Sequence, residues 1–391
     1  MKTFMFPGQG SQSRGMGGNL FDEYSELTKK ADKILGYSIK ELCLKDPRRE
    51  LNKTQFTQPA LFVVNTFSYL KKIEELGVKP DYVIGHSLGE FNALLAADCF
   101  DFETGLKLVK KRGELMSQAT DGAMVAILNA SKEEIETILA ENGLTNIDLA
   151  NYNTPSQIVI SGPVDEIGRA EPFFQKGEML YYPLNTSGAF HSRFMQPSRE
   201  KFEAYLKKFK LSNLKIPVVA NVTAKPYHDE EVMTVLSSQI SSTVRWCESI
   251  QYLLTLDSAS NPMEFVEMGS GDVLTKMVDR IKTDTPKSST GSSVNKNQDN
   301  AQAVKTETGS SGSDKILPKA VNELNKNFVK AEEKVSAWNK KYPVGTKVKS
   351  SVADYGDLET RTEAIVLFGH RAAVYMKEYN GYFDLEEVTP A

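Results

Sequence analysis

Histidine and cysteine are scarce in this sequence, with four and three among 391 residues. Cys43, Cys99 and Cys247 lie far apart and form no CxxC pair, so we expect neither a disulfide framework nor a zinc site. No run of about 18 apolar residues is present, so we expect no membrane-spanning helix. The N-terminus carries no signal-peptide pattern. Together these absences predict a cytoplasmic protein that holds no metal.

A strong charge of either sign is missing as well. The formal net charge is −4 at pH 7 and the isoelectric point is about 5.8, which argues against nucleic acid as the main partner. Hydrophobic residues make up 40% of the chain and charged residues 25%, a balance that can fill a core. The length allows two or three domains.

The sequence does contain a Gly-x-Ser-x-Gly motif at residues 85–89, between a short apolar segment and an Ala/Leu-rich run. A strand, a tight turn and a helix form the context in which such a serine acts as a nucleophile. The turn lifts the Ser87 hydroxyl, and the free amides of the helix N-terminus point toward it. The plainer alternative is an ordinary turn in which Ser87 caps the helix.

A glycine-rich loop follows the first apolar segment, with glycines at positions 8, 10, 15 and 17. Such a loop can present backbone amides to an oxyanion or to phosphate, although a flexible turn has the same composition. The spacing does not fit the Gly-x-Gly-x-x-Gly pattern.

A nucleophilic serine needs a base with a pKa near 7 within hydrogen-bond reach. His86 adjoins Ser87 and should point away from it, His228 lies in a polar loop, and His370 is more typical of a turn. Elimination leaves His191, in a loop of small residues, as the predicted base.

One charged side chain shares a helix face with apolar residues. Residues 102–119 predict a helix in which Val109, Arg112 and Met116 are spaced so that they point inward together. An inward arginine needs an anionic partner. That partner is either an internal Asp or Glu or the carboxylate of a substrate, gripped in a bidentate fork.

Strand and helix signals alternate over residues 3–282, which predicts an α/β fold. A helical pattern covers residues 22–46, and a second covers residues 59–76. Residues 122–186 give the order β-α-β-β-α-β, which is that of a ferredoxin-like unit.

The composition changes at the C-terminal end of this region. Residues 287–313 are rich in Ser, Gly, Asn and Lys and predict a flexible linker. Residues 314–391 predict a helix followed by a small antiparallel sheet or barrel, with a hairpin at Asn380-Gly381. The first domain is therefore placed at residues 1–286, and the C-terminal part is a small, mainly β accessory domain.

Ser87 with His191 implies covalent acyl chemistry, in which an acyl-serine forms. The amide of Leu88 supplies one donor to the oxyanion, and the loop around Gln9 is the best source of the second. No Asp or Glu stands out to orient His191, so a carbonyl oxygen could hold it instead. An inward Arg112 favours an acyl group that carries its own carboxylate.

These ordered motifs resemble the malonyl-CoA:acyl carrier protein acyltransferases over about residues 3–282. The matching segments are residues 6–12 (FPGQGSQ), 85–90 (GHSLGE), the helix of Arg112, 189–192 (AFHS) and 267–271 (EMGSG). The resemblance implies an α/β-hydrolase-like large subdomain with an inserted ferredoxin-like small subdomain. It also implies that Ser87 carries the malonyl ester and that His191 is the base.

The resemblance assigns further roles. It implies that the amides of Gln9 and Leu88 form the oxyanion hole and that Arg112 holds the malonyl carboxylate. It implies that the main-chain carbonyl of Gln239 orients His191, which would explain the missing acid. Malonyl-CoA enters as a substrate, and no cofactor is expected.

Within that family, residues 100–106 and 188–191 resemble the free-standing acyltransferases that act in trans for polyketide synthases. A bulky Phe190 suits malonyl and would crowd a methyl branch. Ser270, where many members have Pro, and the C-terminal unit depart from the pattern. The implied partners are malonyl-CoA and carrier protein domains of a polyketide synthase. The alternatives are a housekeeping fatty-acid malonyltransferase, a hydrolase that clears stalled acyl carrier proteins, and a non-catalytic scaffold that docks on a synthase.

Overall fold

The computed structural model describes residues 1–284, 333–351, 358–367, 371–377 and 382–391. The chain divides into two compact units, Met1–Thr285 and Pro286–Ala391. The linker predicted at residues 287–313 lies outside the described residues. Among the helices described, none has both the length and the apolar character that crossing a membrane requires.

One of the two four-stranded sheets of the first unit is parallel throughout. Its strand order is β7-β2-β1-β8, with β1 Lys2–Phe6, β2 Tyr82–Gly85, β7 Val218–Val219 and β8 Glu264–Glu267. Phe6 at the end of β1 lies opposite Gly85 at the end of β2. Because the carboxyl ends of parallel strands meet at one edge, the glycine-rich loop and Ser87 leave the sheet side by side.

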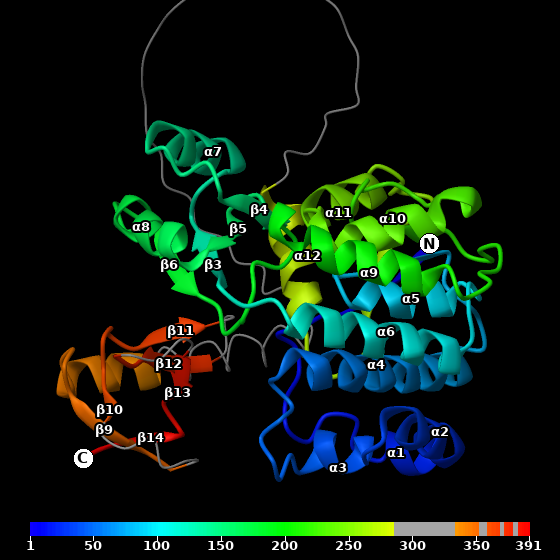
Figure 1. Cartoon of the computed structure of the whole chain (residues 1–391), viewed down its shortest axis with the longest axis horizontal. Coiled ribbons are helices and arrows are strands. Elements are labelled where there is room, and N and C mark those ends of the chain that lie inside the picture. The colour runs from blue at the N-terminus through cyan, green and yellow to red at the C-terminus, as the bar shows by residue number, and fades with distance from the viewer. Residues whose placement is uncertain (285–332, 352–357, 368–370, 378–381) are drawn as a thin grey trace, which may run out of the picture. The chain divides into compact units, whose positions relative to one another are not determined.

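Helices cover this sheet. Figure 1 shows α4, α6 and α9 stacked beside one another, and α4 packs on α6, which packs on α9. The first unit contains α1 Leu20–Glu23, α2 Ser25–Leu35, α3 Ile39–Leu44, α4 Thr54–Leu76, α5 Gly89–Ala96, α6 Phe102–Ser117, α9 Gln196–Leu206, α10 Val232–Ser238, α11 Trp246–Leu254 and α12 Val273–Asp284. Together with the parallel sheet, these helices confirm the predicted α/β fold.

The helical pattern predicted over residues 22–46 does not form one helix. Gly36 adopts a left-handed φ of 86°, which ends α2. The Ser38 hydroxyl then accepts from the Glu41 backbone N–H and caps α3. The apolar period runs through this break because both helices bury residues in the same core.

The other four-stranded sheet of the first unit is antiparallel. Its order is β4-β5-β3-β6, from β3 Gly122–Leu128, β4 Asp148–Thr154, β5 Gln157–Pro163 and β6 Leu180–Pro183. Helices α7 Lys132–Glu141 and α8 Val164–Phe174 complete it and share its hydrophobic core (Figure 1). The edge strand β4 joins the larger part, since the Tyr152 N–H donates to Val244 O and the Val244 N–H donates to Ala150 O.

The second unit has two three-stranded sheets in its described part. One has the order β10-β9-β14 (β9 Lys347–Ser350, β10 Leu358–Glu359, β14 Val388–Pro390), and the other β11-β12-β13 (β11 Ile365–Leu367, β12 Arg371–Tyr375, β13 Tyr382–Asp384). Residues 333–341 are helical, and Trp338 packs against a core that includes Val348 and Met376. Strands β12 and β13 pair antiparallel, while the predicted turn Asn380-Gly381 lies outside the described residues.

Candidate active site

Ser87 sits in a sharp turn between β2 and α5, which we call the elbow (residues 85–89). Its φ is +49°, a left-handed conformation that costs a residue other than glycine about 1–3 kcal/mol. The flanking glycines permit the turn. A Cβ on Gly85 would lie 1.9 Å from the carbonyl carbon of Gly89, and one on Gly89 would lie 1.9 Å from the carbonyl oxygen of Phe6. Only glycine fits at these two positions, so packing fixes the path of the elbow.

Asn221 holds the elbow from the neighbouring strand. Its Oδ1 accepts from the Ser87 N–H at 2.7 Å, and its Nδ2 donates to the Gly85 carbonyl at 2.6 Å. The side chain is fully buried and follows β7, which pairs with β2. These bonds satisfy backbone groups that the turn would otherwise leave unpaired.

His191 lies directly against the Ser87 hydroxyl. Its Nε2 is 2.7 Å from Ser87 Oγ, and its Nδ1 is 2.9 Å from the carbonyl oxygen of Gln239. A carbonyl only accepts, so Nδ1 carries the proton and Nε2 is left to accept from the serine. Burial and the nearby charge of Arg112 lower the pKa of His191 to about 3, which keeps the imidazole neutral at pH 7.

The other histidine of the motif faces elsewhere. His86 Nε2 is 2.8 Å from Asn153 Oδ1 on β4, so the ring is turned toward the antiparallel sheet. This agrees with the prediction that His86 points away from Ser87.

Arg112 of α6 reaches the same hydroxyl from another side. Its Nη2 donates to Ser87 Oγ at 3.1 Å and to Gln239 Oε1 at 2.8 Å, and its Nη1 donates to Gln58 Oε1 at 2.8 Å. The side chain is 1% exposed, and its Nε finds no partner among the described residues. Burial lowers the pKa of Arg112 to about 10, against the opposing charge of Glu90, so the guanidinium stays charged at pH 7.

The alternative that Arg112 pairs with an internal Asp or Glu is wrong for the described part of the chain. All of its hydrogen-bond acceptors there are neutral: two amide oxygens and a hydroxyl. Amide oxygens satisfy the guanidinium without cancelling its charge. The arrangement can therefore receive an anion beside Ser87.

Two backbone segments that were predicted to hold an oxyanion lie next to each other. The His86 N–H donates to the Phe6 carbonyl at 2.9 Å, and a Cβ on Gly8 would lie 2.3 Å from the His86 carbonyl oxygen. Gln9 follows Gly8 in this loop and is therefore held close to the elbow. Its Nε2 contacts Thr54 Oγ1 at 3.4 Å. Leu88 is fully buried at the start of α5, where helix amides lack internal acceptors.

Phe190, the predicted specificity residue, is 3% exposed and belongs to the main hydrophobic core. Its ring would lie 2.9 Å from a Cβ added to Gly188, so the loop before His191 is closely packed. Gln239 is fully buried, in the short helical turn Gln239–Ser241.

Sequence reasoning missed the carboxylate behind the site. Glu90 is fully buried, and it accepts from the Tyr227 hydroxyl at 2.7 Å, from the Asn221 N–H at 3.0 Å and from Gln239 Nε2. Burial raises the pKa of Glu90 to about 7, although these donors act in the opposite direction. The available signal is a charged residue inside the motif at residues 85–90, in the first turn of a mostly apolar helix.

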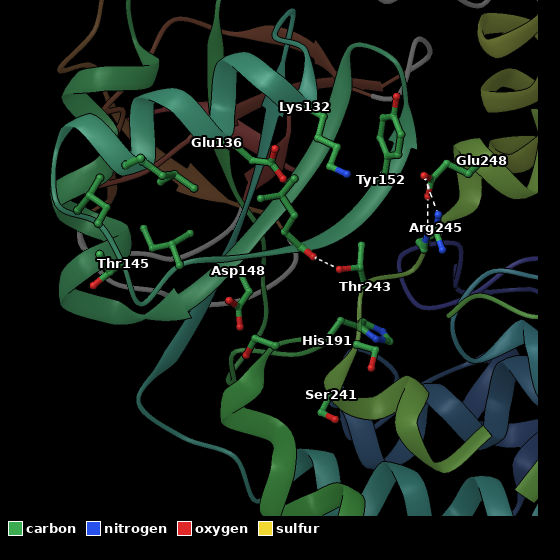
Figure 2. Close-up of a pocket in the computed structure, with 17 residues that line it drawn as sticks. Lys132, Glu136, Thr145, Asp148, Tyr152, His191, Ser241, Thr243, Arg245 and Glu248 are labelled. Atoms are coloured by element: carbon green, nitrogen blue, oxygen red, sulfur yellow. Dashed lines mark hydrogen bonds and ion pairs between the residues drawn. The ribbon is translucent and has the colours of Figure 1, made fainter. Parts of the chain in front are cut away.

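A cavity of about 700 Å³ opens from His191 and Ser192 toward the antiparallel sheet. Figure 2 shows Lys132 and Glu136 of α7 on one wall, and Thr243 and the Arg245–Glu248 ion pair on the other. This size is within the range of small-molecule sites. A substrate could therefore approach His191 along a cleft with charged walls. No cluster of metal-ligating side chains occurs among the described residues.

Comparisons with known proteins agree on one family. The model of the acyl transferase domain matches residues 3–316. A polyketide biosynthesis malonyl CoA-acyl carrier protein transacylase of Bacillus velezensis is 53% identical over 73% of this chain and 98% of its own length. A protein of Bacillus subtilis described in the same words is 54% identical, with 73% and 98% covered.

A solved structure extends the agreement to three dimensions. The malonyl CoA-acyl carrier protein transacylase from Burkholderia pseudomallei superposes with a TM-score of 0.72 at 60% identity, over 73% of this chain and 99% of that one. Each of these three relatives is thus matched over nearly its whole length, by about three quarters of this chain.

Proposed function

The chain belongs to the acyl transferase domain family, and on that premise we propose that it transfers a malonyl group from malonyl-CoA to the phosphopantetheine thiol of an acyl carrier protein. The observation that carries the proposal is the charged Arg112, whose Nη2 lies 3.1 Å from Ser87 Oγ and whose acceptors among the described residues are neutral. A guanidinium so placed suits an acyl group with a carboxylate at its far end.

The first half-reaction loads Ser87. His191 Nε2 takes the hydroxyl proton as Ser87 Oγ attacks the thioester carbonyl. The backbone amides of Gln9 and Leu88 stabilise the oxyanion of the tetrahedral intermediate. The carbon–sulfur bond then breaks, and the coenzyme A sulfur leaves with the proton from His191.

The second half-reaction runs in the opposite direction. The carrier thiol gives its proton to His191, and its sulfur attacks the ester carbonyl. The ester bond breaks, and Ser87 Oγ recovers the proton. The acyl donor and the acyl acceptor bind in turn, so the kinetics are ping-pong, and the route uses no cofactor beyond the two substrates.

Two residues shape the acyl pocket in this proposal, and a third orients the base. Arg112 binds the malonyl carboxylate, which favours malonyl over acetyl. Phe190 crowds a methyl branch. The Gln239 carbonyl orients His191 in place of an acid, which the 2.9 Å contact with Nδ1 supports.

The relatives named for polyketide biosynthesis support a role in trans for a polyketide synthase. We assign residues 1–286 to the acyltransferase domain, with an α/β-hydrolase-like large part and a ferredoxin-like insertion at about residues 122–186. The strand order β4-β5-β3-β6, with two crossover helices, supports that finer assignment. Residues 287–313 are the linker, residues 314–391 are an accessory domain, and the protein acts in the cytoplasm.

The test incubates the full chain with malonyl-CoA and a carrier protein and weighs both proteins by mass spectrometry. We expect a malonyl adduct on Ser87 and then on the carrier, and no adduct on Ser87→Ala. Free malonate without a loaded carrier would identify a hydrolase instead. Wild-type behaviour of Ser87→Ala would identify a scaffold. Carriers from polyketide and fatty-acid synthases, compared at equal concentration, distinguish the trans-acting role from the housekeeping one.

A further inference from the structure

A buried carboxyl group stands one helical turn behind the nucleophile. Glu90 lies in the first turn of α5 and is 0% exposed. The Tyr227 hydroxyl and the Asn221 N–H donate to its Oε1 at 2.7 and 3.0 Å, and Gln239 Nε2 donates to its Oε2. Neutral groups from three separate segments thus satisfy it, and no described lysine or arginine bonds to it directly.

Gln239 connects this carboxyl group to Ser87, Arg112 and His191. Its Nε2 donates to Glu90 and, at 2.8 Å, to the carbonyl of Ser87. Its Oε1 accepts from Arg112 Nη2 at 2.8 Å. Its main-chain oxygen lies 2.9 Å from His191 Nδ1. The side-chain amide therefore separates the acid from the guanidinium.

The chemistry at both ends sets the orientation of that amide. Glu90 Oε2 and the Ser87 carbonyl require a donor, so the NH₂ group must face them. The Arg112 guanidinium has only donors, so the amide oxygen must face it. A flipped amide would bring its NH₂ against the guanidinium and its oxygen against the carboxylate.

We propose that Glu90 is a positioning residue for acyl-group selection. By holding the Gln239 amide between itself and Arg112, it keeps the guanidinium beside Ser87 while no carboxylate of the described residues bonds to that guanidinium. The inference rests on the proposed function, because it concerns how the malonyl carboxylate finds its arginine. Direct contact between Glu90 and Arg112 would neutralise the charge that the substrate needs, whereas an intervening amide weakens that Coulomb attraction.

The same carboxyl group also supports the elbow, and that effect must be separated from selectivity. The Asn221 N–H bonds to Glu90, and the Asn221 side chain holds the backbone of Ser87 and Gly85. A distorted elbow would slow every acyl donor alike. The ratio of malonyl to acetyl acylation isolates the effect that passes through Arg112.

The experiment measures single-turnover acylation of Ser87 in the full chain by malonyl-CoA and by acetyl-CoA, using intact-protein mass spectrometry. Glu90→Gln introduces an NH₂ group opposite Gln239 Nε2 or opposite the Asn221 N–H, so two donors must meet. We expect the malonyl-to-acetyl rate ratio to fall at least tenfold. Tyr227→Phe removes a different bond to Glu90 and should leave the ratio within twofold of wild type. An unchanged ratio in Glu90→Gln, or an equal loss of both rates, would overturn the proposal.

A second variant keeps the test decisive if Glu90→Gln does not fold. Gln239→Leu removes the amide but retains the carbonyl that holds His191, and it should lower the ratio in the same direction. In the double variant the two ratio changes should not multiply, because both act through one amide. If the ratio change in the double variant equals the product of the two single changes, the inference is contradicted. Absence of a malonyl adduct on wild type would instead refute the proposed function.

Discussion

Replacing Arg112 with methionine tests how the site recognises its acyl group. Methionine keeps an unbranched apolar side chain on α6 but removes the guanidinium that bonds Ser87, Gln58 and Gln239. Every acyl donor loses the 3.1 Å bond to the Ser87 hydroxyl. Only malonyl also loses the partner of its own carboxylate, so the ratio of the two rates isolates that pair.

The size of the expected change follows from burial. Arg112 is 1% exposed, and removing one partner of a buried ion pair costs about 3–5 kcal/mol. At about 1.4 kcal/mol per tenfold change, the malonyl-to-acetyl rate ratio should fall by roughly two to three and a half powers of ten. Two glutamine oxygens also lose their donor, at about 1–3 kcal/mol each in the free energy of unfolding. Losing the buried charge offsets part of that cost.

Single-turnover acylation of Ser87 by the two donors, with a denaturant melt of each variant, measures both effects. Lys107→Met is the matched control, because it makes the same change of charge at an exposed position of the same helix. It should leave the ratio and the melting midpoint as in wild type. Equal losses of malonyl and acetyl transfer in Arg112→Met would show that Arg112 is structural and would refute the reasoning.

Two further predictions concern the base and the boundary between the units. Because burial and the charge of Arg112 lower the pKa of His191 to about 3, the base stays neutral through the usual histidine range. Glu90, whose pKa burial raises to about 7, titrates within that range, so the test uses Glu90→Gln. In this variant the rate of Ser87 acylation by acetyl-CoA should change less than twofold between about pH 5.5 and 8. An inflection near pH 6.5 would contradict this. The contribution of His191 to stability is present above about pH 6.5 and is lost as pH falls toward 3, since only the unfolded chain binds the proton in that interval. A chain ending at residue 285 should stay soluble and acylate Ser87 within twofold of the full chain, measured as above. An insoluble product would show that the core of the first unit needs residues beyond that point.

Local features of the site were predictable from sequence. The strand, turn and helix around Ser87 depend on a few neighbouring residues, and the structure has β2 and α5 on either side of the elbow. Elimination among four histidines led to His191, because a nucleophile needs a base and few candidates existed. The inward direction of Arg112 followed from helical spacing alone and agrees with its burial.

The partners of those residues were not predictable from spacing. Asn221 lies 134 positions from Ser87, and Gln58 lies 54 positions from Arg112. Such contacts depend on strand order and helix packing, which one sequence does not encode in any local pattern. The choice between a salt bridge and an anion site for Arg112 stayed open for the same reason. Asn221 had a usable signal, as a polar residue two positions after the apolar pair Val218-Val219, which forms a strand of the parallel sheet.

The tight contact between Gly89 and the carbonyl of Phe6 limits how this enzyme can be engineered. It joins the elbow to the loop that carries Gln9, so a side chain added at position 89 would push the two halves of the oxyanion site apart. Libraries that aim at new extender units should therefore leave residues 85–89 untouched. Diversity belongs at Phe190, which shapes the acyl pocket in the proposed mechanism and lies outside the elbow.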